Sequence, residues 1–271
     1  MKQSVVKIIS TIFPTPVAAW AYSQLLNPQV KKLRDNELAV LDKAEKAIFK
    51  FKNFDIQLYT WRGGADSVLL IHGWEGQAGN FTDVVEQLIA RNYTVYAFDA
   101  PSHGFSSKGQ TSLFEFIELV GILIRKYSVR KLISHSFGGV ATTYALYINP
   151  DLHIDKYLLF TVPDKFSERI DDVAAQAGIT EKVKNKLIRR LAAETNLDIH
   201  SLNVSDFVKK INVAQALIIH DSNDTVIPIE RAQNVAANWQ NAQLVEITGT
   251  GHFRILRTPS VIAEGLAFLQ D

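Results

Sequence analysis

The chain has 271 residues, of which 47% are hydrophobic and 21% charged, a composition typical of a globular protein with a large core. Its 29 lysines and arginines balance 28 aspartates and glutamates, so the chain lacks the basic field that attracts nucleic acid, and we exclude that partner. The absence of cysteine excludes disulfides, thiolate metal sites, iron–sulfur clusters and cysteine nucleophiles.

The N-terminal segment carries Lys2 and Lys7 around the start of an apolar stretch that ends near residue 17. A secretory signal peptide is one interpretation of this pattern. We favour a helical arm over residues 1–45, because apolar residues recur at helical spacing between Val5 and Phe13. The arm would pack on the body of the protein or contact a membrane peripherally, since the stretch is shorter than the ~20 residues of a membrane span. We expect a cytoplasmic protein, with secretion or membrane association left open by this segment.

Strand patterns begin after this arm. Residues 47–51 and 54–61 predict a hairpin, and six short apolar runs follow, each with a turn and a helical period behind it. Continuous apolar strands are typical of a sheet covered on both faces, and alternation with helices implies parallel strands. We therefore predict an α/β fold over residues 46–271, with a mostly parallel central sheet of about eight strands and helices on both faces. The six runs are 67–71, 93–98, 131–134, 157–161, 216–219 and 244–247.

One interval departs from this alternation of strands and helices. Residues 163–211 are helix-like and rich in charge, and the interval is far longer than one crossover helix requires. We predict that it forms a small helical cap, inserted between two strands and covering the site. In such sheets the catalytic groups collect at the carboxyl ends of the strands, so we expect the site there.

The strongest chemical signal is the segment from Lys131 to Ala141, an apolar strand, a tight turn with Ser136 at its apex, and a helix that starts among small residues. This pattern is a nucleophile elbow, in which a sharp turn needs small residues two positions either side of the serine. Gly138 meets that need, and Ser134 stands where the usual pattern has its first glycine. We predict that Ser136 is a nucleophile and that the amide of Phe137 is one donor to an oxyanion.

A serine nucleophile needs a base within hydrogen-bond reach and a third group that orients the base. His252 lies in a glycine-containing loop directly after the last predicted strand, and the expected chain order is serine, acid, histidine. We predict that His252 is the general base. For the acid, the residues behind the strand at 216–219 offer two carboxylates, Asp221 and Asp224.

Five short motifs in this order together resemble the α/β-hydrolases, in particular their serine esterases and lipases. They are 70–74 (Leu-Ile-His-Gly-Trp), 98–104 (Phe-Asp-Ala-Pro-Ser-His-Gly), 134–139 around Ser136, 224–228 (Asp-Thr-Val-Ile-Pro) and Gly251-His252. The resemblance covers residues from about 48 to 271 and leaves the N-terminal arm outside.

The resemblance implies roles for further residues. In the family, the catalytic acid precedes a turn made of a hydrophobic residue and a proline. Asp224 stands at that position, which leaves Asp221 as a residue that shapes the loop through hydrogen bonds. The amide of Trp74 would be the second oxyanion donor, and His72 would organise that loop through its side chain. Asp99 would belong to a structural turn.

These residues predict a serine hydrolase of the carboxylesterase type, which cleaves an ester or related acyl bond through an acyl-enzyme intermediate. Trp74, Phe137 and Phe253 flank the machinery and suit a small to medium hydrophobic substrate. We expect no cofactor and no metal, and the sequence indicates no oligomeric state. Two alternatives stay open, an acyltransferase or lyase with the same triad, and a ligand-binding or partner-binding module on a hydrolase fold.

Overall fold

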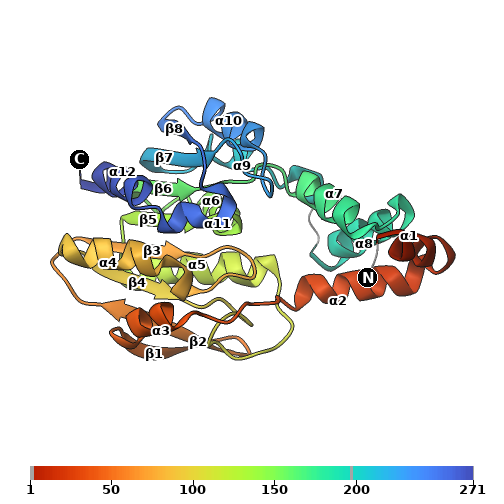
Figure 1. Cartoon of the computed structure of the whole chain (residues 1–271), viewed down its shortest axis with the longest axis horizontal. Helices are drawn as coiled ribbons and strands as arrows, with labels where there is room; N and C mark the ends of the chain where they lie inside the picture. The colour runs from red at the N-terminus through yellow and green to blue at the C-terminus, as the bar shows by residue number, and fades with distance from the viewer. Residues whose placement is uncertain (1–2, 196–197, 271) are drawn as a thin grey trace. The chain divides into compact units, whose positions relative to one another are not determined.

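The computed structural model describes residues 3–195 and 198–270, and Figure 1 traces them from red to blue along the chain. Its contacts divide the chain into two compact units. The helical unit consists of residues 1–27 with 165–203, and the sheet unit consists of residues 28–164 with 204–271.

The sheet unit is built on one sheet of eight strands in the order β1-β2-β4-β3-β5-β6-β7-β8. Strand β2 runs antiparallel to its neighbours β1 and β4, and the remaining pairs are parallel. This topology confirms the predicted mostly parallel sheet. The strands are β1 (Glu45–Phe51), β2 (Phe54–Trp61), β3 (Ser67–Ile71), β4 (Thr94–Phe98), β5 (Lys131–His135), β6 (Ile154–Phe160), β7 (Val213–Asp221) and β8 (Ala242–Ile247).

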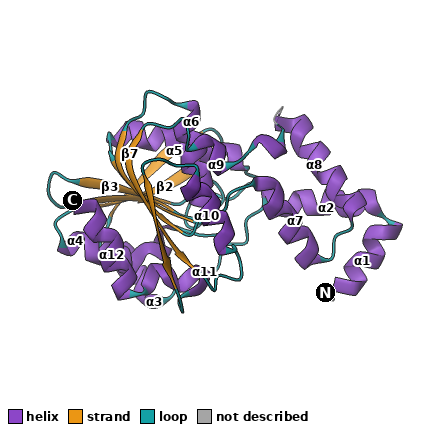
Figure 2. Ribbon diagram, turned by 90° about the horizontal axis from the view of Figure 1, so that it is seen from above, coloured by secondary structure: helices purple, strands orange, loops and turns teal. Residues whose placement is uncertain are grey.

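Helices cover both faces of this sheet, as Figure 2 shows for α4 and α12 on one side and α5 and α6 on the other. The central strands are largely apolar because neither face of the sheet there meets water; Val68 to Ile71 of β3, for example, are all buried. The helices of the sheet unit are α3 (Asp35–Asp42), α4 (Thr82–Ala90), α5 (Leu113–Tyr127), α6 (Phe137–Ile148), α9 (Val204–Phe207), α10 (Ile229–Ala237), α11 (Gly251–Arg254) and α12 (Pro259–Gln270), with short 3₁₀ turns at Ala78–Phe81 (η1) and Ile255–Arg257 (η3).

The helical unit joins two distant parts of the sequence. Helices α1 (Gln3–Ile12) and α2 (Pro14–Leu26) pack with α7 (Phe166–Ala177) and α8 (Glu181–Thr195), and a 3₁₀ turn follows at Ile199–Ser201. Buried side chains of α2 and α8 form its small cores, one around Val17 and Val183 and the other around Tyr22 and Leu187. The N-terminal helices thus share a core with helices from residues 163–211, the interval predicted to form a cap. No helix in the described part of the chain has the length and apolar character that crossing a membrane requires.

Candidate active site

The candidate residues follow the carboxyl ends of neighbouring parallel strands. Register pairs align Ile71 at the end of β3 with Ser134 of β5, and Asp221 at the end of β7 with Ile247 of β8. The loops behind these strands therefore emerge at one edge of the sheet, where α/β folds place their sites.

Ser136 stands at a sharp turn between β5 and α6. Its backbone has φ 55° and ψ −122°, a conformation that L-residues other than glycine seldom adopt and that is held only where the surroundings enforce it. Here its amide donates to the carbonyls of Phe160 (3.0 Å) and Thr161 (2.8 Å). The residue is partly exposed, so the turn presents it at the surface of the edge.

Small residues make the turn fit, as the sequence predicted. A Cβ on Gly138 would lie 2.4 Å from the carbonyl oxygen of Ile71, so this position admits only glycine without movement of the backbone. Ser134 replaces the other usual glycine, and its buried hydroxyl is 2.8 Å from that of Tyr157. A serine is therefore accommodated because it has a hydrogen-bond partner.

His252 and Asp224 form a buried pair in which Nδ1 lies 2.8 Å from Oδ2. The amides of Val226 and Ile227 donate to Oδ1 of the same carboxylate at 2.7 and 2.9 Å. Burial acts to raise the pKa of Asp224, but the hydrogen bond and charge of His252, with the two amides, outweigh it and hold the pKa below its ordinary value. An ionised Asp224 fixes the proton of His252 on Nδ1 and leaves Nε2 able to accept one.

Asp221 lies beside this pair and has a different role. Its carboxylate is buried and accepts hydrogen bonds from the amides of Asn223, Thr250 and Gly251 and from the hydroxyl of Thr250. Burial acts to raise its pKa, and these hydrogen bonds lower it further than burial raises it. The loop-shaping role predicted for Asp221 is confirmed by these contacts.

The loop after β3 approaches the elbow closely. A Cβ on Gly73 would lie 3.1 Å from the carbonyl oxygen of His135 and 3.3 Å from Cβ of Ser136. The rings of Trp74 and Phe137 are in edge contact, with centroids 5.3 Å apart. Among the hydrogen bonds of the described residues, the amides of Trp74 and Phe137 have no acceptor, so two donors are left unused where the sequence predicted an oxyanion hole.

Two neutral histidines hold this loop in place. His72 donates from Nδ1 to the carbonyl of Gly73 (2.7 Å) and accepts from the amide of Ala100 (3.0 Å) at Nε2. His103 accepts from the amide of Glu75 (3.1 Å). Burial lowers the pKa of His72 to about 4 and that of His103 to about 3, so both accept these bonds as neutral rings. The predicted role of His72 as the organiser of the loop is confirmed.

Asp99 is a structural residue in the neighbouring turn. It is fully buried and accepts from the amides of Ala78 and Phe105, both at 2.8 Å, and from the hydroxyl of Tyr59 at 3.0 Å. These bonds join η1, the turn after β4 and strand β2.

Aromatic residues flank the candidate site. The ring of Phe253 is exposed and stands edge-on to that of His252, with centroids 4.8 Å apart. The ammonium of Lys31 lies 5.6 Å from the centroid of Phe253. Trp74 is partly exposed, as is Phe137, so apolar surface is available beside both the elbow and the histidine.

Sequence reasoning missed two features of this edge. The segment before α3 crosses it, because the amide of Gln29 donates to Oε1 of Glu75 (3.1 Å) and Nε2 of Gln77 donates to the carbonyl of Lys31 (2.6 Å). His135, directly before the nucleophile candidate, contacts the His252 loop. The histidine inside the elbow motif was a sequence signal for the contact of His135. No sequence pattern indicated the contacts of the segment before α3.

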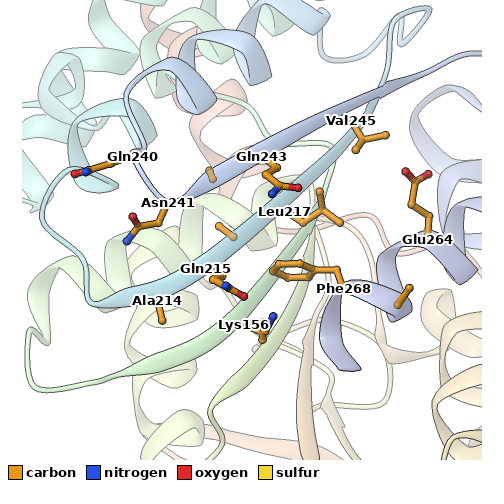
Figure 3. Close-up of a pocket in the computed structure, with 13 residues that line it drawn as sticks. Lys156, Ala214, Gln215, Leu217, Gln240, Asn241, Gln243, Val245, Glu264 and Phe268 are labelled. Carbon is orange, nitrogen blue, oxygen red and sulfur yellow. The ribbon is translucent and has the colours of Figure 1, made fainter. Parts of the chain in front are cut away.

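A pocket of about 670 Å³ lies elsewhere in the sheet unit. Figure 3 shows Gln215 and Gln243 on neighbouring strands, with Phe268 of α12 beside them. Its strand residues come from the amino-terminal halves of β6 and β7 and from β8, whereas the candidate residues follow the carboxyl ends. The lining includes no serine and no histidine, so we do not assign the chemistry to this pocket.

Comparison with known proteins places this arrangement in a family. A model described as "Alpha/beta hydrolase family" matches residues 68–264. The uncharacterized hydrolase YugF of Bacillus subtilis (strain 168) is 24% identical, over 75% of this chain and 89% of that protein. A pimeloyl-[acyl-carrier protein] methyl ester esterase of Xanthomonas campestris pv. campestris (strain B100) is 22% identical over 75% and 94%. Among solved structures, the Pyrococcus furiosus esterase Pf2001 has a TM-score of 0.66 at 18% identity, covering 91% of this chain and 97% of that one.

Proposed function

Because this chain belongs to the alpha/beta hydrolase family, we propose that it is a serine hydrolase of the carboxylesterase type. In this proposal Ser136 is the nucleophile, His252 the general base and Asp224 the acid that orients it. The reaction is hydrolysis of an ester or related acyl bond.

The observation that carries the proposal is the buried pair of His252 and Asp224, 2.8 Å apart, at the same edge as the strained turn of Ser136. The neighbour of that serine, His135, contacts the histidine loop directly. A carboxylate, an imidazole and a partly exposed serine at one edge are the groups that acyl transfer through serine requires.

The steps follow from these positions. Ser136 Oγ attacks the acyl carbonyl while Nε2 of His252 takes its proton, and ionised Asp224 stabilises the imidazolium that forms. The free amides of Trp74 and Phe137 would hold the oxyanion of the tetrahedral intermediate, where each donor is worth roughly 3 kcal/mol. The intermediate expels the alcohol, which receives the proton from His252. Water, deprotonated by His252, then releases the acid from the acyl-enzyme.

The substrate class follows from what surrounds these groups. Trp74 and Phe137 flank the elbow, and Phe253 stands against His252. Aromatic side chains beside the proposed catalytic groups suit a small to medium hydrophobic acyl or alcohol group. No cofactor takes part in this chemistry.

The test is labelling of the purified protein with a fluorophosphonate, read by intact mass beside Ser136→Ala. We expect one adduct on the wild type and none on the variant. A p-nitrophenyl ester series of increasing chain length then measures the size of the acyl site. Faster reaction with an added alcohol, thiol or amine acceptor than with water would indicate an acyltransferase, and slow ester turnover beside rapid cleavage of another substrate a lyase. An unlabelled, well-folded wild type would instead favour a binding module.

Two further proposals concern the rest of the chain. The cap role of residues 163–211 stays a prediction. Peripheral membrane contact through the N-terminal segment also stays one, and the exposed apolar side chains of α1 support it. They lie at helical spacing and are Val5, Ile8, Ile9 and Ile12, with Phe13 directly after the helix.

A further inference from the structure

His135 precedes the proposed nucleophile, yet its side chain reaches the loop of the proposed base. Its Nε2 lies 2.8 Å from the main-chain carbonyl oxygen of His252. Because a carbonyl only accepts, Nε2 carries the proton and donates it. The imidazole ring also contacts that of His252, with centroids 4.9 Å apart and planes 54° from parallel. One side chain therefore meets both the backbone and the ring of His252.

The imidazole of His135 is well suited to a fixed role. The residue is 93% buried, since its relative exposure is 7%. Burial and, to a smaller extent, the nearby charge of His252 together lower its pKa to about 3. His135 is thus a neutral donor near pH 7, and it does not compete for the proton that His252 would accept.

The loop that carries His252 is held at three points. Asp221 receives the amides of Thr250 and Gly251, and the guanidinium of Arg254 donates to the carbonyls of Gly249 (2.9 Å) and Thr250 (3.1 Å). His135 holds the third point, the carbonyl of His252 itself. Asp221 and Arg254 connect the loop to β7 and to its own helix, whereas His135, among the described residues, connects it to the nucleophile elbow by a hydrogen bond.

This difference matters because the reaction depends on the distance between two separately positioned loops. Ser136 is fixed by β5 and by its amide bonds to the end of β6, and His252 is fixed by β7 and by Arg254. A displacement of about 1 Å between reacting groups can cost on the order of a hundredfold in rate. A contact from the residue beside the nucleophile to the residue of the base sets that distance directly.

We propose that His135 is a positioning residue, whose Nε2–H donor to the His252 carbonyl fixes the proposed base relative to Ser136. The inference rests on the proposed function, because it concerns the same two groups. It assigns to His135 a role in the rate of proton transfer and none in substrate binding.

Two substitutions separate the donor from the ring. His135→Gln keeps an N–H at the position of Nε2, since both atoms lie three bonds from Cβ, and it loses the ring. His135→Phe keeps a ring and loses the donor, which leaves the His252 carbonyl unsatisfied. His135→Met, of similar bulk and greater flexibility, is a second variant without a donor in case phenylalanine does not fold. His153→Phe is the matched control, because His153 precedes the amino end of β6 and is partly exposed.

The experiment measures kcat and KM with p-nitrophenyl butyrate, the rate of fluorophosphonate labelling and the melting temperature. We expect the phenylalanine and methionine variants to lose about tenfold in kcat and in labelling rate, with KM changed less than about twofold. Glutamine should stay within about threefold of the wild type, and His153→Phe should not change.

The possible outcomes separate this inference from the proposed function. Equal labelling of wild type and both variants without a donor would overturn the role of His135 and leave the nucleophile intact. A loss in the glutamine variant as large as in the phenylalanine variant, with a fall in melting temperature, would also overturn it, because the ring would then act by packing. No labelling of the wild type would instead contradict the proposed function.

Discussion

The carboxylate of Asp221 accepts hydrogen bonds from both the amide and the hydroxyl of Thr250. This contact joins the loop after β7 to the loop after β8, three residues from the carboxylate that pairs with His252. Asp221, the last residue of β7, therefore binds main chain and the Thr250 hydroxyl, whereas Asp224 in the following loop also binds the imidazole of His252.

Asp221→Asn tests the first of these roles. The asparagine side chain keeps one oxygen and has an NH₂ group in place of the other. That NH₂ group would face main-chain N–H groups, which lose their acceptor. We expect a loss of about 2–4 kcal/mol in the free energy of unfolding, measured by urea denaturation. An unchanged unfolding free energy would contradict the structural role.

Asp224→Asn should give the opposite balance. The variant no longer holds the proton of His252 on Nδ1, so Nε2 cannot serve as the base, and kcat should fall by about 10³–10⁴. Its unfolding free energy should change less than that of Asp221→Asn. A larger rate loss in the Asp221 variant at equal folding would reverse our assignment of the acid.

Gly138→Ala should disrupt the elbow. The new methyl would lie 2.4 Å from a carbonyl oxygen of β3, which the backbone must move to relieve. We expect about 3 kcal/mol or more of lost stability and little fluorophosphonate labelling. Gly139→Ala is the control, because its methyl would meet only side chains at 3.3 Å or more. Its stability should stay within about 1 kcal/mol of the wild type. Equal stability of the two variants would refute the close approach at Gly138.

Acid should destabilise the fold through buried histidines. Burial lowers the pKa of His72 to about 4, and those of His103 and His135 to about 3. The unfolded chain binds protons at these residues below about pH 6.5 and the native state does not, so stability is present above that pH and falls as the pH falls. The three together should contribute a slope of roughly 3–4 kcal/mol per pH unit between pH 6 and 5. Burial raises the pKa of Asp99. This carboxyl therefore has the opposite effect on stability, which it increases as the pH falls.

Urea unfolding at pH 5, 6 and 7 measures this slope. His103→Asn should lower the slope by about 1 kcal/mol per pH unit, the share of one buried neutral histidine. A wild-type curve that is flat between pH 5 and 7 would show that these histidines do not stay neutral in the native state.

The exposed apolar side chains of α1 should bind anionic vesicles. Replacing Ile8 and Ile12, which are 59% and 62% exposed, by glutamate removes apolar area and adds charge of the wrong sign. We expect sedimentation with phosphatidylglycerol vesicles to fall at least about fivefold for the double variant. Ile148→Glu, at an exposed position of α6, should not change it. A wild type that stays in the supernatant, or that forms dimers through α1, would contradict membrane contact.

Much of the sheet could be predicted from the sequence. The patterns at 54–61 and 67–71 coincide with β2 and β3, because apolar runs bounded by turn residues fix strands locally. The helical arm expected over residues 1–45 is not continuous, because helix stops at Leu26 and resumes only at Asp35–Asp42. The residues just before α3 are held by side chains of the loop after β3, a contact that no local pattern encodes.

The site divides in the same way. The elbow, the acid loop and the histidine loop each contain a short motif of turn residues. Ser136, Asp224 and His252 could therefore be predicted as candidate catalytic residues from the sequence. The contact of His135 with residue 252 spans 117 positions, and the partnership of α2 with α8 likewise joins distant amphipathic faces. Both depend on tertiary packing, which local spacing does not determine.

The crossing segment of Gln29 to Lys31 has a practical consequence for trimming this protein. The family match begins at residue 68, yet chain from residue 29 onwards touches Glu75, Gln77 and Phe253. A shortened protein that starts at β1 would retain every proposed catalytic group and lose the backbone that contacts Glu75, Gln77 and Phe253. The contacts that reach the candidate site therefore begin upstream of residue 68, where the family match begins.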